Sequence, residues 1–481
     1  MILDIFKTFI PIFSIAILIF SIIIIMLNMS LYKNFFISYY TVLLSLIFCV
    51  IFLFFPNYKI FFSLSKFIIY DNYTRIFLGL LYISGFFTCI FIKYFLNFNY
   101  VQKEIFYLFL LISIIGGIIV SLSTHIILFL MGMELLFLPI IGLINCSNTK
   151  YTLIISIKYF FVSILTTSFM LLGFAFLYLI YGSLNFSNIF SYFILCNNSV
   201  TKVLINISVL FILIPIFFKL SLFPFHFFLR DIYKFTFSPV LIYFTTATKI
   251  SLILFLTHFL SKIYYLKNYI ITYQILFFFI ILSIFFGNFL AFFQKNIKIV
   301  LSYASISHTG LILMLLLNNS FLNKIFPEFI YSIISYILST ICFFSILSIL
   351  EYQQDKKKQN IQYHSLKGLF WYHPVFGIII TILLFVFSGF PLTLNFWGKF
   401  YLLRFAIKKK LWFLLFSLVY SSFFSIFCYF PFLQNIYLFP EKFNALFFQK
   451  TFKISKIYII MIIFLISTLV FYGFFPNILK F

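Results

Sequence analysis

Apolar runs of about 20 residues, the length with which a helix crosses the hydrocarbon core of a bilayer, follow one another along nearly the whole chain. Short polar links separate these runs, and the longest link extends from Glu351 to Lys367. The pattern predicts an all-α polytopic membrane protein that forms a single transmembrane domain over residues 1–481. About fourteen transmembrane helices are expected, near residues 8–28, 37–56, 75–97, 105–122, 124–145, 152–182, 202–223, 238–260, 269–293, 297–318, 328–350, 374–403, 411–431 and 456–476.

The composition excludes a water-soluble fold. Hydrophobic residues make up 64% of the chain and charged residues 9%, whereas soluble domains carry about 25% charged residues. The net charge is +24, but most basic residues are scattered singly between the apolar runs. Charges in such positions face water and lipid headgroups, so we expect contact with lipids and no binding of nucleic acid.

Residue usage indicates where the chain is encoded. It contains 81 Phe and 33 Tyr, and its most frequent residues have A/T-rich codons. This bias is typical of proteins encoded by small, A+T-rich organellar genomes. The first apolar run lacks a small-residue cleavage site, so we expect it to remain as a helix and not to be removed as a signal peptide.

Two of the apolar runs contain internal breaks. Pro224 follows Lys219 by five residues in the first, and Gly389 and Pro391 precede Lys399 in the second. Proline removes a backbone donor and clashes with the preceding turn, so each helix is expected to kink or end there. Broken backbone at membrane depth persists only where protein covers it or where it lines a hydrated cavity. A lysine beside such a break is therefore a candidate for an ion path.

The two breaks fall at matching places along the chain. Counting five spans for each half gives two segments, residues 105–260 and 269–431, each with its break in the fourth span. Interrupted helices at corresponding positions are typical of transporters built from inverted repeats. The sequence therefore predicts two inverted five-helix repeats, each containing a broken helix.

Charged residues inside the apolar runs are few. Of the nine acids, only Glu134 lies well inside a run, and an ionised side chain at the bilayer centre costs about 2.5–3.5 kcal/mol or more. A lysine partner would offset this cost, and the candidates are Lys158, Lys219, Lys249 and Lys399. One interpretation is a static ion pair that fixes helix packing. The other, favoured by the number of lysines and by the two breaks, is a proton relay controlled by electrostatics.

Two histidines are further candidates for proton carriers. His226 follows the first break and His308 lies within the run at residues 297–318. Imidazole changes its charge near neutral pH, but an isolated polar residue in a membrane helix is also often a hydrogen-bonded packing element. Both interpretations stay open for each histidine.

The sequence contains no glycine-rich nucleotide motif, no metal-ligand spacing and no nucleophile motif. Its six cysteines are far apart and match no haem, zinc or iron–sulfur spacing. We therefore expect no cofactor and no redox chemistry in this chain itself.

Several ordered motifs resemble those of subunit 2 of NADH:ubiquinone oxidoreductase, the respiratory complex I. Phe218 to Phe227 read F-K-L-S-L-F-P-F-H-F, and D-I-Y follows at Asp231. The family reads close to F-K-x-S-x-x-P-F-H-x-W and then D-V-Y. Further similar motifs are M-G-M-E-L at 131–135, K-Y-F at 158–160, Y-G-S-L-N-F at 181–186, the segment 287–310 and F-W-G-K-F-Y at 396–401. The resemblance extends over most of the chain, and several motifs in the same order make it specific.

The resemblance implies a role for each candidate residue. Glu134 and Lys219 would be the coupled pair of a first half-channel, Lys249 the central connecting lysine, and Lys399 the lysine of a second half-channel. In the same way, the polar axis would include His226 and His308. Lys158 matches the lysine of the family's K-Y-F motif.

The resemblance also implies function and partners. The chain would be a proton-translocating membrane-arm subunit, coupling quinone reduction to proton pumping in the mitochondrial inner membrane. NAD, FMN, iron–sulfur clusters and ubiquinone would belong to other subunits, and the expected neighbours are subunits 4, 4L, 6 and 3, accessory subunits and lipids. The alternatives are subunit 4 of the same complex, a related monovalent cation/proton antiporter subunit, and a non-conducting structural subunit.

Overall fold

The helices and strands of a computed structural model cover most of the chain. The structure describes residues 10–54, 62–64, 68–99, 103–186, 199–264, 270–317, 327–353, 366–439 and 456–476. Contacts divide the chain into two compact units. The first unit contains Met1–Leu220 and Ile242–Thr272, and the second contains Ser221–Leu241 and Tyr273–Phe481.

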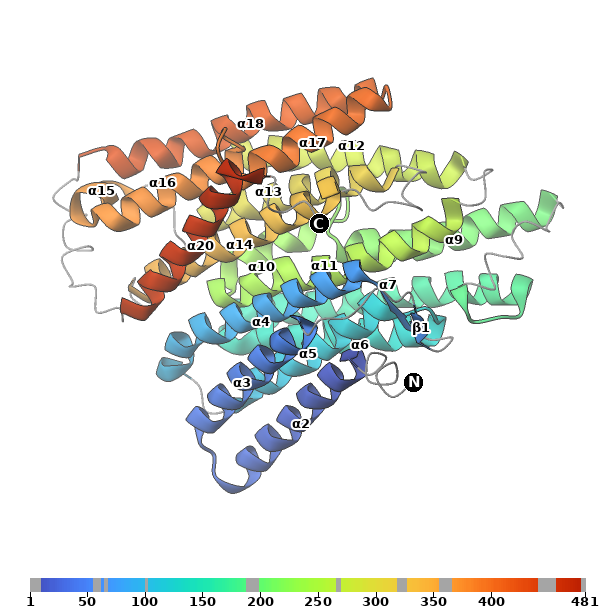
Figure 1. Ribbon diagram of the computed structural model, residues 1–481, viewed down its shortest axis with the longest axis horizontal. Helices are drawn as coiled ribbons and strands as arrows, with labels where there is room; N and C mark the ends of the chain where they lie inside the picture. The colour runs from blue at the N-terminus through green and yellow to red at the C-terminus, as the bar shows by residue number, and fades with distance from the viewer. Residues whose placement is uncertain are drawn as a thin grey trace. The chain divides into compact units, whose positions relative to one another are not determined.

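The first unit is built from long apolar helices (Figure 1). They are α2 (Ile10–Leu31), α3 (Phe35–Phe54), α4 (Asn72–Asn99), α5 (Glu104–Leu122), α6 (Ile126–Ile144), α7 (Lys150–Tyr181), α9 (Ser199–Lys219) and most of α11 (Ser238–Tyr264), together with the short helix η1 (Asn145–Ser147). A small antiparallel pair of strands, β1 (Phe62–Leu64) and β2 (Ile68–Tyr70), joins α3 to α4. Among the described residues this short hairpin is the one pair of strands, and the predicted helical fold is confirmed for the other elements.

The described secondary-structure elements of the second unit are all helices. Its elements are α10 (Phe227–Phe235), the first residues of α11, nearly all of α12 (Ile270–Phe292), α13 (Ile297–Met314), η2 (Leu315–Leu317), α14 (Pro327–Gln353), α15 (Leu369–Tyr372), α16 (Pro374–Ser388), α17 (Leu394–Lys408), α18 (Trp412–Tyr437) and α20 (Lys456–Phe474). Helix α20 packs on α14, α16 and α17 and runs across them at an angle (Figure 1).

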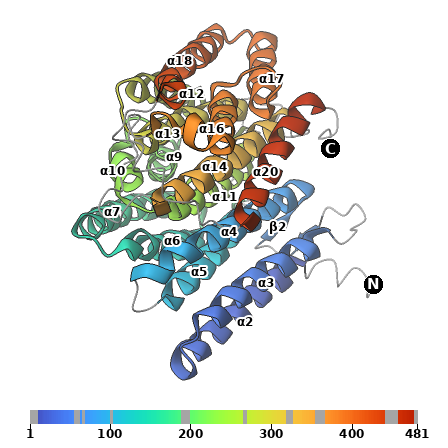
Figure 2. The same cartoon turned by 90° about the vertical axis from the view of Figure 1, so that its left-hand side faces the viewer.

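Close helix packing in the first unit depends on small residues. Helices α2 and α3 form an antiparallel hairpin (Figure 2), and α5 and α6 form another. At Gly116 on α5, a Cβ atom would lie 2.3 Å from the backbone nitrogen of Leu136 on α6. Glycine therefore allows the two backbones to approach, which is a common device between membrane helices because lipid supplies little hydrophobic force for packing.

Two helices are buried on all sides over most of their length, α11 within Ser238–Ser261 and α13 within Ile297–Leu317. Both contain hydroxyl side chains that bond to carbonyls of their own helix, for example Thr248 to Phe244 and Ser302 to Ile299. Such helices have no contact with lipid, and they contain polar side chains. A membrane protein can therefore accommodate charged groups in them.

Each expected apolar run overlaps a helix of the structure. Eleven of the described helices are long and apolar enough to cross a membrane, and three shorter apolar helices accompany them. The run expected over 374–403 is divided between α16 and α17, and the run expected to extend to residue 223 ends at Lys219. The number of crossings and the inverted repeats stay predictions.

Candidate functional site

The first break follows α9. Leu220 donates the last helical hydrogen bond, 2.8 Å to the carbonyl of Ile216, and Ser221 then has a φ of 60°. This left-handed conformation turns the chain out of the helical path, so α9 ends before it reaches Pro224. Lys219 is consequently the last residue of α9, with its carbonyl outside the regular helical ladder.

The first unit contains the charged side chain of Lys219 at the end of α9. This side chain is buried, and its Nζ lies 3.9 Å from the ring centroid of Phe137 on α6. Glu134 lies three residues before Phe137 on the same helix, and its carboxylate acts electrostatically on Lys219. The structure thus brings together the two residues that the sequence predicted as a pair, with an aromatic ring against the ammonium. A desolvated cation–π contact of this kind stabilises the cation by about 2 kcal/mol.

Glu134 differs from the sequence-based expectation in its burial. Its side chain is exposed at the surface of this chain, on a face of α6 that also exposes Met131, Leu135 and Leu138. The position halfway along an apolar helix was predicted correctly, but which face of α6 points outward depends on tertiary packing. Lys158 on α7 is likewise exposed, so neither residue is enclosed by this chain alone.

Lys249 lies in the middle of α11, and its side chain is 3% exposed. Three hydroxyl residues, Thr246, Thr248 and Ser251, lie within three residues of it and are also buried. These hydroxyls bond to carbonyls of their own helix, so this stretch of α11 combines a lysine with buried polar side chains.

The second break separates α16 from α17. Helix α16 ends at Ser388, and Gly389 follows with a φ of 79°, a conformation that favours glycine. Lys399 on α17 donates a hydrogen bond of 2.8 Å from Nζ to the carbonyl of Ser388. Ser425 on α18 donates to the same carbonyl at 3.2 Å. The half-buried ammonium therefore closes the carboxyl end of a helix, where the aligned peptide dipoles favour a positive charge.

The space at this break fits the lysine closely. A Cβ atom on Gly389 would lie 2.9 Å from Lys399 Nζ. Asn395 ties the two sides of the break together, because its amide donates to the carbonyl of Val386 at 3.0 Å while its oxygen accepts from Ser335 on α14 at 3.4 Å. The partner that holds Lys399, the carbonyl of Ser388, thus lies on the other side of the break and outside the motif at 396–401.

Both predicted histidines are buried in the second unit. His226 stacks with Phe223 and Phe227, and its Nδ1 has no hydrogen-bond partner among the residues that the structure describes. His308 on α13 contacts the rings of Tyr336 and Phe387. These surroundings fit either a packing role or a proton-carrying role.

An ion pair that the sequence analysis missed also lies in the second unit. Lys298 at the start of α13 pairs with Glu351 near the end of α14, and their side chains are 1% and 5% exposed. The sequence placed Glu351 at the end of an apolar run, where water was expected to reach it. Asn296, the cap of α13, lies two residues before Lys298. This cap indicates the start of a helix but does not identify a partner for Lys298 that lies 53 residues away in the sequence.

Metal chemistry finds no support in the described part of the chain, where no group of three or more His, Cys, Asp or Glu residues could hold a metal ion. The predicted site residues are lysines, histidines and the carboxylate of Glu134, in or beside apolar helices. Such groups can hold and exchange protons.

Comparison with known proteins identifies the class of membrane protein that this fold represents. A family model described as "NADH:quinone oxidoreductase/Mrp antiporter, TM" matches residues 123–425, and the chain belongs to this family. Among its relatives, NADH-quinone oxidoreductase subunit N of Buchnera aphidicola subsp. Acyrthosiphon pisum (strain APS) is 37% identical over 429 residues, covering 87% of this chain and 86% of the relative. Subunit N of Buchnera aphidicola subsp. Schizaphis graminum (strain Sg) is 32% identical over 430 residues, covering 87% and 85%.

Solved structures show the same fold. A chain of respiratory complex I from Thermus thermophilus with bound Aureothin matches with a TM-score of 0.77 at 21% identity, covering 96% of this chain and 97% of that one. A chain of the Mrp complex from Dietzia sp. DQ12-45-1b matches with a TM-score of 0.77 at 14% identity, covering 98% and 95%. The protein is therefore a multi-pass membrane protein with the fold of these antiporter-like subunits.

The relatives correct one expectation from the sequence. They are bacterial, so the mitochondrial inner membrane has no support as the location. The reason lies in the signal that was used, because A/T-rich codon usage shapes amino-acid composition in any genome with that mutational bias. Residue usage reports the nucleotide bias and not the compartment.

Proposed function

We propose that this chain is the subunit N equivalent, also called subunit 2, of a proton-translocating NADH:quinone oxidoreductase. Its relatives at 37% and 32% identity are named as subunit N of that enzyme, which favours this role over that of subunit 4. Quinone reduction elsewhere in the complex would drive protons through this chain. The groups that would carry them are Glu134, Lys219, Lys249, Lys399, His226, His308 and Lys158.

One observation carries the proposal, namely the position of Lys219. Its ammonium is buried at the end of a broken helix, against the ring of Phe137, and within electrostatic range of Glu134. A buried ammonium keeps its proton while a carboxylate and an aromatic face stabilise it. A change in the charge of Glu134 would remove part of that stabilisation, so Lys219 would release its proton.

The remaining steps follow from the same electrostatics. A proton released by Lys219 would pass toward Lys249, and Lys399 would exchange a proton with the aqueous side. Each charge moved across the membrane costs about 2.3 kcal/mol per 100 mV. Several subunits that share the energy of one redox reaction can meet this cost, and so a subunit without a cofactor of its own can pump.

Other subunits have two roles in this proposal. NAD, FMN, iron–sulfur clusters and ubiquinone would be bound by them, and this chain would bind none. A neighbouring membrane-arm subunit would cover the exposed face of α6 that carries Glu134, since a carboxylate is costly against lipid. The candidates for that neighbour are subunits 4, 4L, 6 and 3 and the accessory subunits.

The test compares Lys219→Met with Lys150→Met in inverted membrane vesicles that contain the assembled complex. Lys150 is an exposed lysine at the first residue of α7, so its replacement controls for the loss of a positive charge. We expect Lys219→Met to lower the number of protons moved per NADH oxidised, with normal assembly, and Lys150→Met to leave it unchanged. Normal pumping by Lys219→Met would remove Lys219 from the path.

A second candidate function is that of a cation/proton antiporter subunit, which the fold shared with the Mrp complex favours. A native gel of the source membranes, stained for NADH oxidation, separates the two. Peptides of this chain in the NADH-oxidising band support the oxidoreductase. A chain that migrates away from this activity, together with sodium- or potassium-dependent proton flux in vesicles, supports the antiporter.

A further inference from the structure

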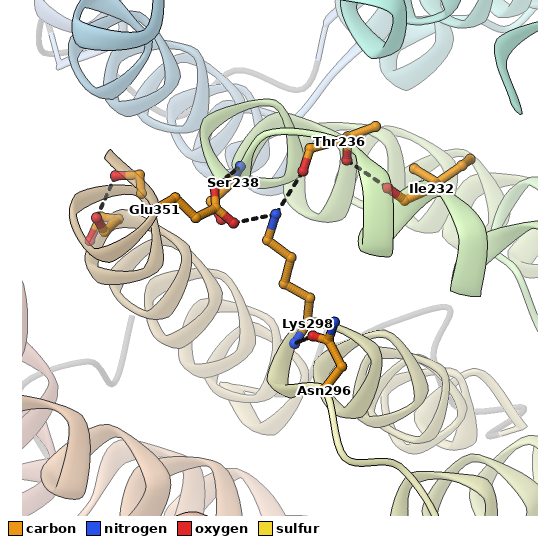
Figure 3. A network of polar contacts seen from close by, with 8 residues as sticks. Ile232, Thr236, Ser238, Asn296, Lys298 and Glu351 are labelled. Carbon is orange, nitrogen blue, oxygen red and sulfur yellow. Dashed lines mark hydrogen bonds and ion pairs between the residues drawn. The ribbon is translucent and has the colours of Figure 1, made fainter. Parts of the chain in front are cut away.

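Four helix ends meet around the Lys298–Glu351 pair in the second unit (Figure 3). Helix α10 ends at Phe235 with Thr236 as its cap, and α11 begins at Ser238. Helix α13 begins at Ile297, just before Lys298, and α14 ends at Gln353, just after Glu351. The ion pair therefore lies where the end of α10, the start of α11, the start of α13 and the end of α14 come together.

Each charged group closes one of these ends. Lys298 Nζ donates a hydrogen bond of 2.7 Å to the carbonyl of Thr236, at the carboxyl end of α10. Glu351 Oε2 accepts a hydrogen bond of 3.0 Å from the backbone N–H of Ser238, the first residue of α11. Helix ends leave such carbonyls and N–H groups without partners, and their dipoles favour a cation at the carboxyl end and an anion at the amino end. Each charge thus has the favourable sign for the helix end that it contacts.

Each oxygen of the carboxylate makes one contact. Glu351 Oε1 forms the ion pair with Lys298, and Glu351 Oε2 accepts the hydrogen bond from the backbone N–H of Ser238. Lys298 is fixed at its own backbone as well, because its N–H donates to the Asn296 side chain at 3.0 Å. Thr236 and Ser238 are themselves buried. The pair therefore binds one carbonyl and one N–H group of a buried turn.

We infer that Lys298 and Glu351 are positioning residues that clamp the turn from Thr236 to Ser238 and so fix where α11 begins, and that they do not carry protons. The turn joins α10, which follows the first helix break, to α11, the helix that bears Lys249. Lys249 lies eleven residues beyond Ser238, about three turns along the same helix. A displaced first turn would therefore displace the lysine with it.

The decisive variant is Lys298→Arg, because a guanidinium keeps its charge and its donors but cannot release a proton. A clamp tolerates this change, and we expect assembled complex with an unchanged number of protons moved per NADH oxidised. Lys298→Met leaves Glu351 buried without its partner, and we expect the amount of assembled complex to fall several-fold. Lys295→Met is the matched control, since Lys295 is exposed three residues earlier on the same segment.

A second measurement keeps the test decisive if Lys298→Arg does not fit the buried space. Replacing both partners, Lys298→Met with Glu351→Leu, removes the unpaired charge and restores assembly while the N–H of Ser238 loses its acceptor. Hydrogen–deuterium exchange of the Ser238 amide in the assembled complex should then become faster, by about tenfold for one lost hydrogen bond.

Two outcomes would overturn the inference. One is that the complex with Lys298→Arg assembles normally but no longer pumps protons, which would make the pair a proton carrier. The other is unchanged exchange at Ser238 in the double variant, which would show that the pair does not hold the turn. Because the exchange measurement does not depend on pumping, a failed proton-pumping proposal for Lys219 would leave this test intact.

Discussion

The ammonium of Lys219 lies 3.9 Å from the ring centroid of Phe137, one helical turn beyond Glu134 on α6. One helix therefore places an aromatic ring against a buried lysine and carries, on its exposed face, the carboxylate that acts electrostatically on that lysine, although the lysine itself comes from α9. This arrangement gives the protonated lysine two sources of stabilisation that can be removed separately.

Phe137→Leu should weaken proton pumping without preventing assembly. Leucine fills most of the space but has no negative ring face, so the protonated Lys219 loses stabilisation of about 0.5–2 kcal/mol. Phe137→Tyr keeps the ring and is the control. The measurement is the number of protons moved per NADH oxidised in vesicles, and equal ratios for the two variants would show that the ring serves only packing.

Glu134→Gln should lower the pumping ratio while the complex still assembles, because glutamine keeps the shape but not the charge that acts on Lys219. Met131→Gln places the same amide one turn earlier on the same exposed face of α6 and is the control for polarity. If Glu134→Gln reduces assembly and the assembled fraction pumps normally, the non-conducting structural role is the better description.

Gly389→Ala should destabilise the second break more than Gly182→Ala destabilises the end of α7. Both glycines have a left-handed φ, 79° and 62°, so the backbone strain of about 1–3 kcal/mol is shared. A new Cβ at Gly389 would also lie 2.9 Å from Lys399 Nζ, whereas at Gly182 it would meet nothing within 4 Å. Thermal inactivation of the complex measures stability, and a loss of pumping confined to Gly389→Ala would report the displaced lysine.

Gly116→Ala should destabilise the α5–α6 hairpin, by about 1–3 kcal/mol as is usual for overpacking. Its Cβ would lie 2.3 Å from the Leu136 backbone nitrogen, which no side-chain rotation relieves. Gly79→Ala on α4 is the control, because its Cβ would have an ordinary contact of 3.8 Å with Leu53. Thermal unfolding of the purified complex distinguishes them, and a Gly116→Ala variant as stable as Gly79→Ala would contradict the close approach.

Much of the secondary structure follows from local sequence. Apolar runs of bilayer length fix the helices, because a segment that crosses lipid satisfies its backbone groups internally. Pro224 and the Gly389–Pro391 segment marked both breaks. The end of α9 at Lys219 was not predictable from Pro224 alone, since the helix stops earlier, where Ser221 turns to a positive φ.

Tertiary relationships were harder to predict. Lys219 and Glu134 could be paired because few charges lie inside the apolar runs. The outward direction of Glu134 depends on how α6 is rotated against α5 and α7. The sequence of a helix that is apolar on all sides does not encode this rotation. Lys298 and Glu351 lie at run ends, where charges are ordinary, and only the folded chain brings these ends together.

The exposed position of Glu134 has an evolutionary consequence. Under A+T mutational pressure, a lipid-facing position can drift among Phe, Ile and Leu with little penalty. A carboxylate on such a face is a different matter, because any protein surface that covers it must supply a compensating donor. Substitutions at Glu134 should therefore covary with substitutions in the surface that covers it. Sequence covariation between this chain and its neighbours can then identify the subunit that packs on α6.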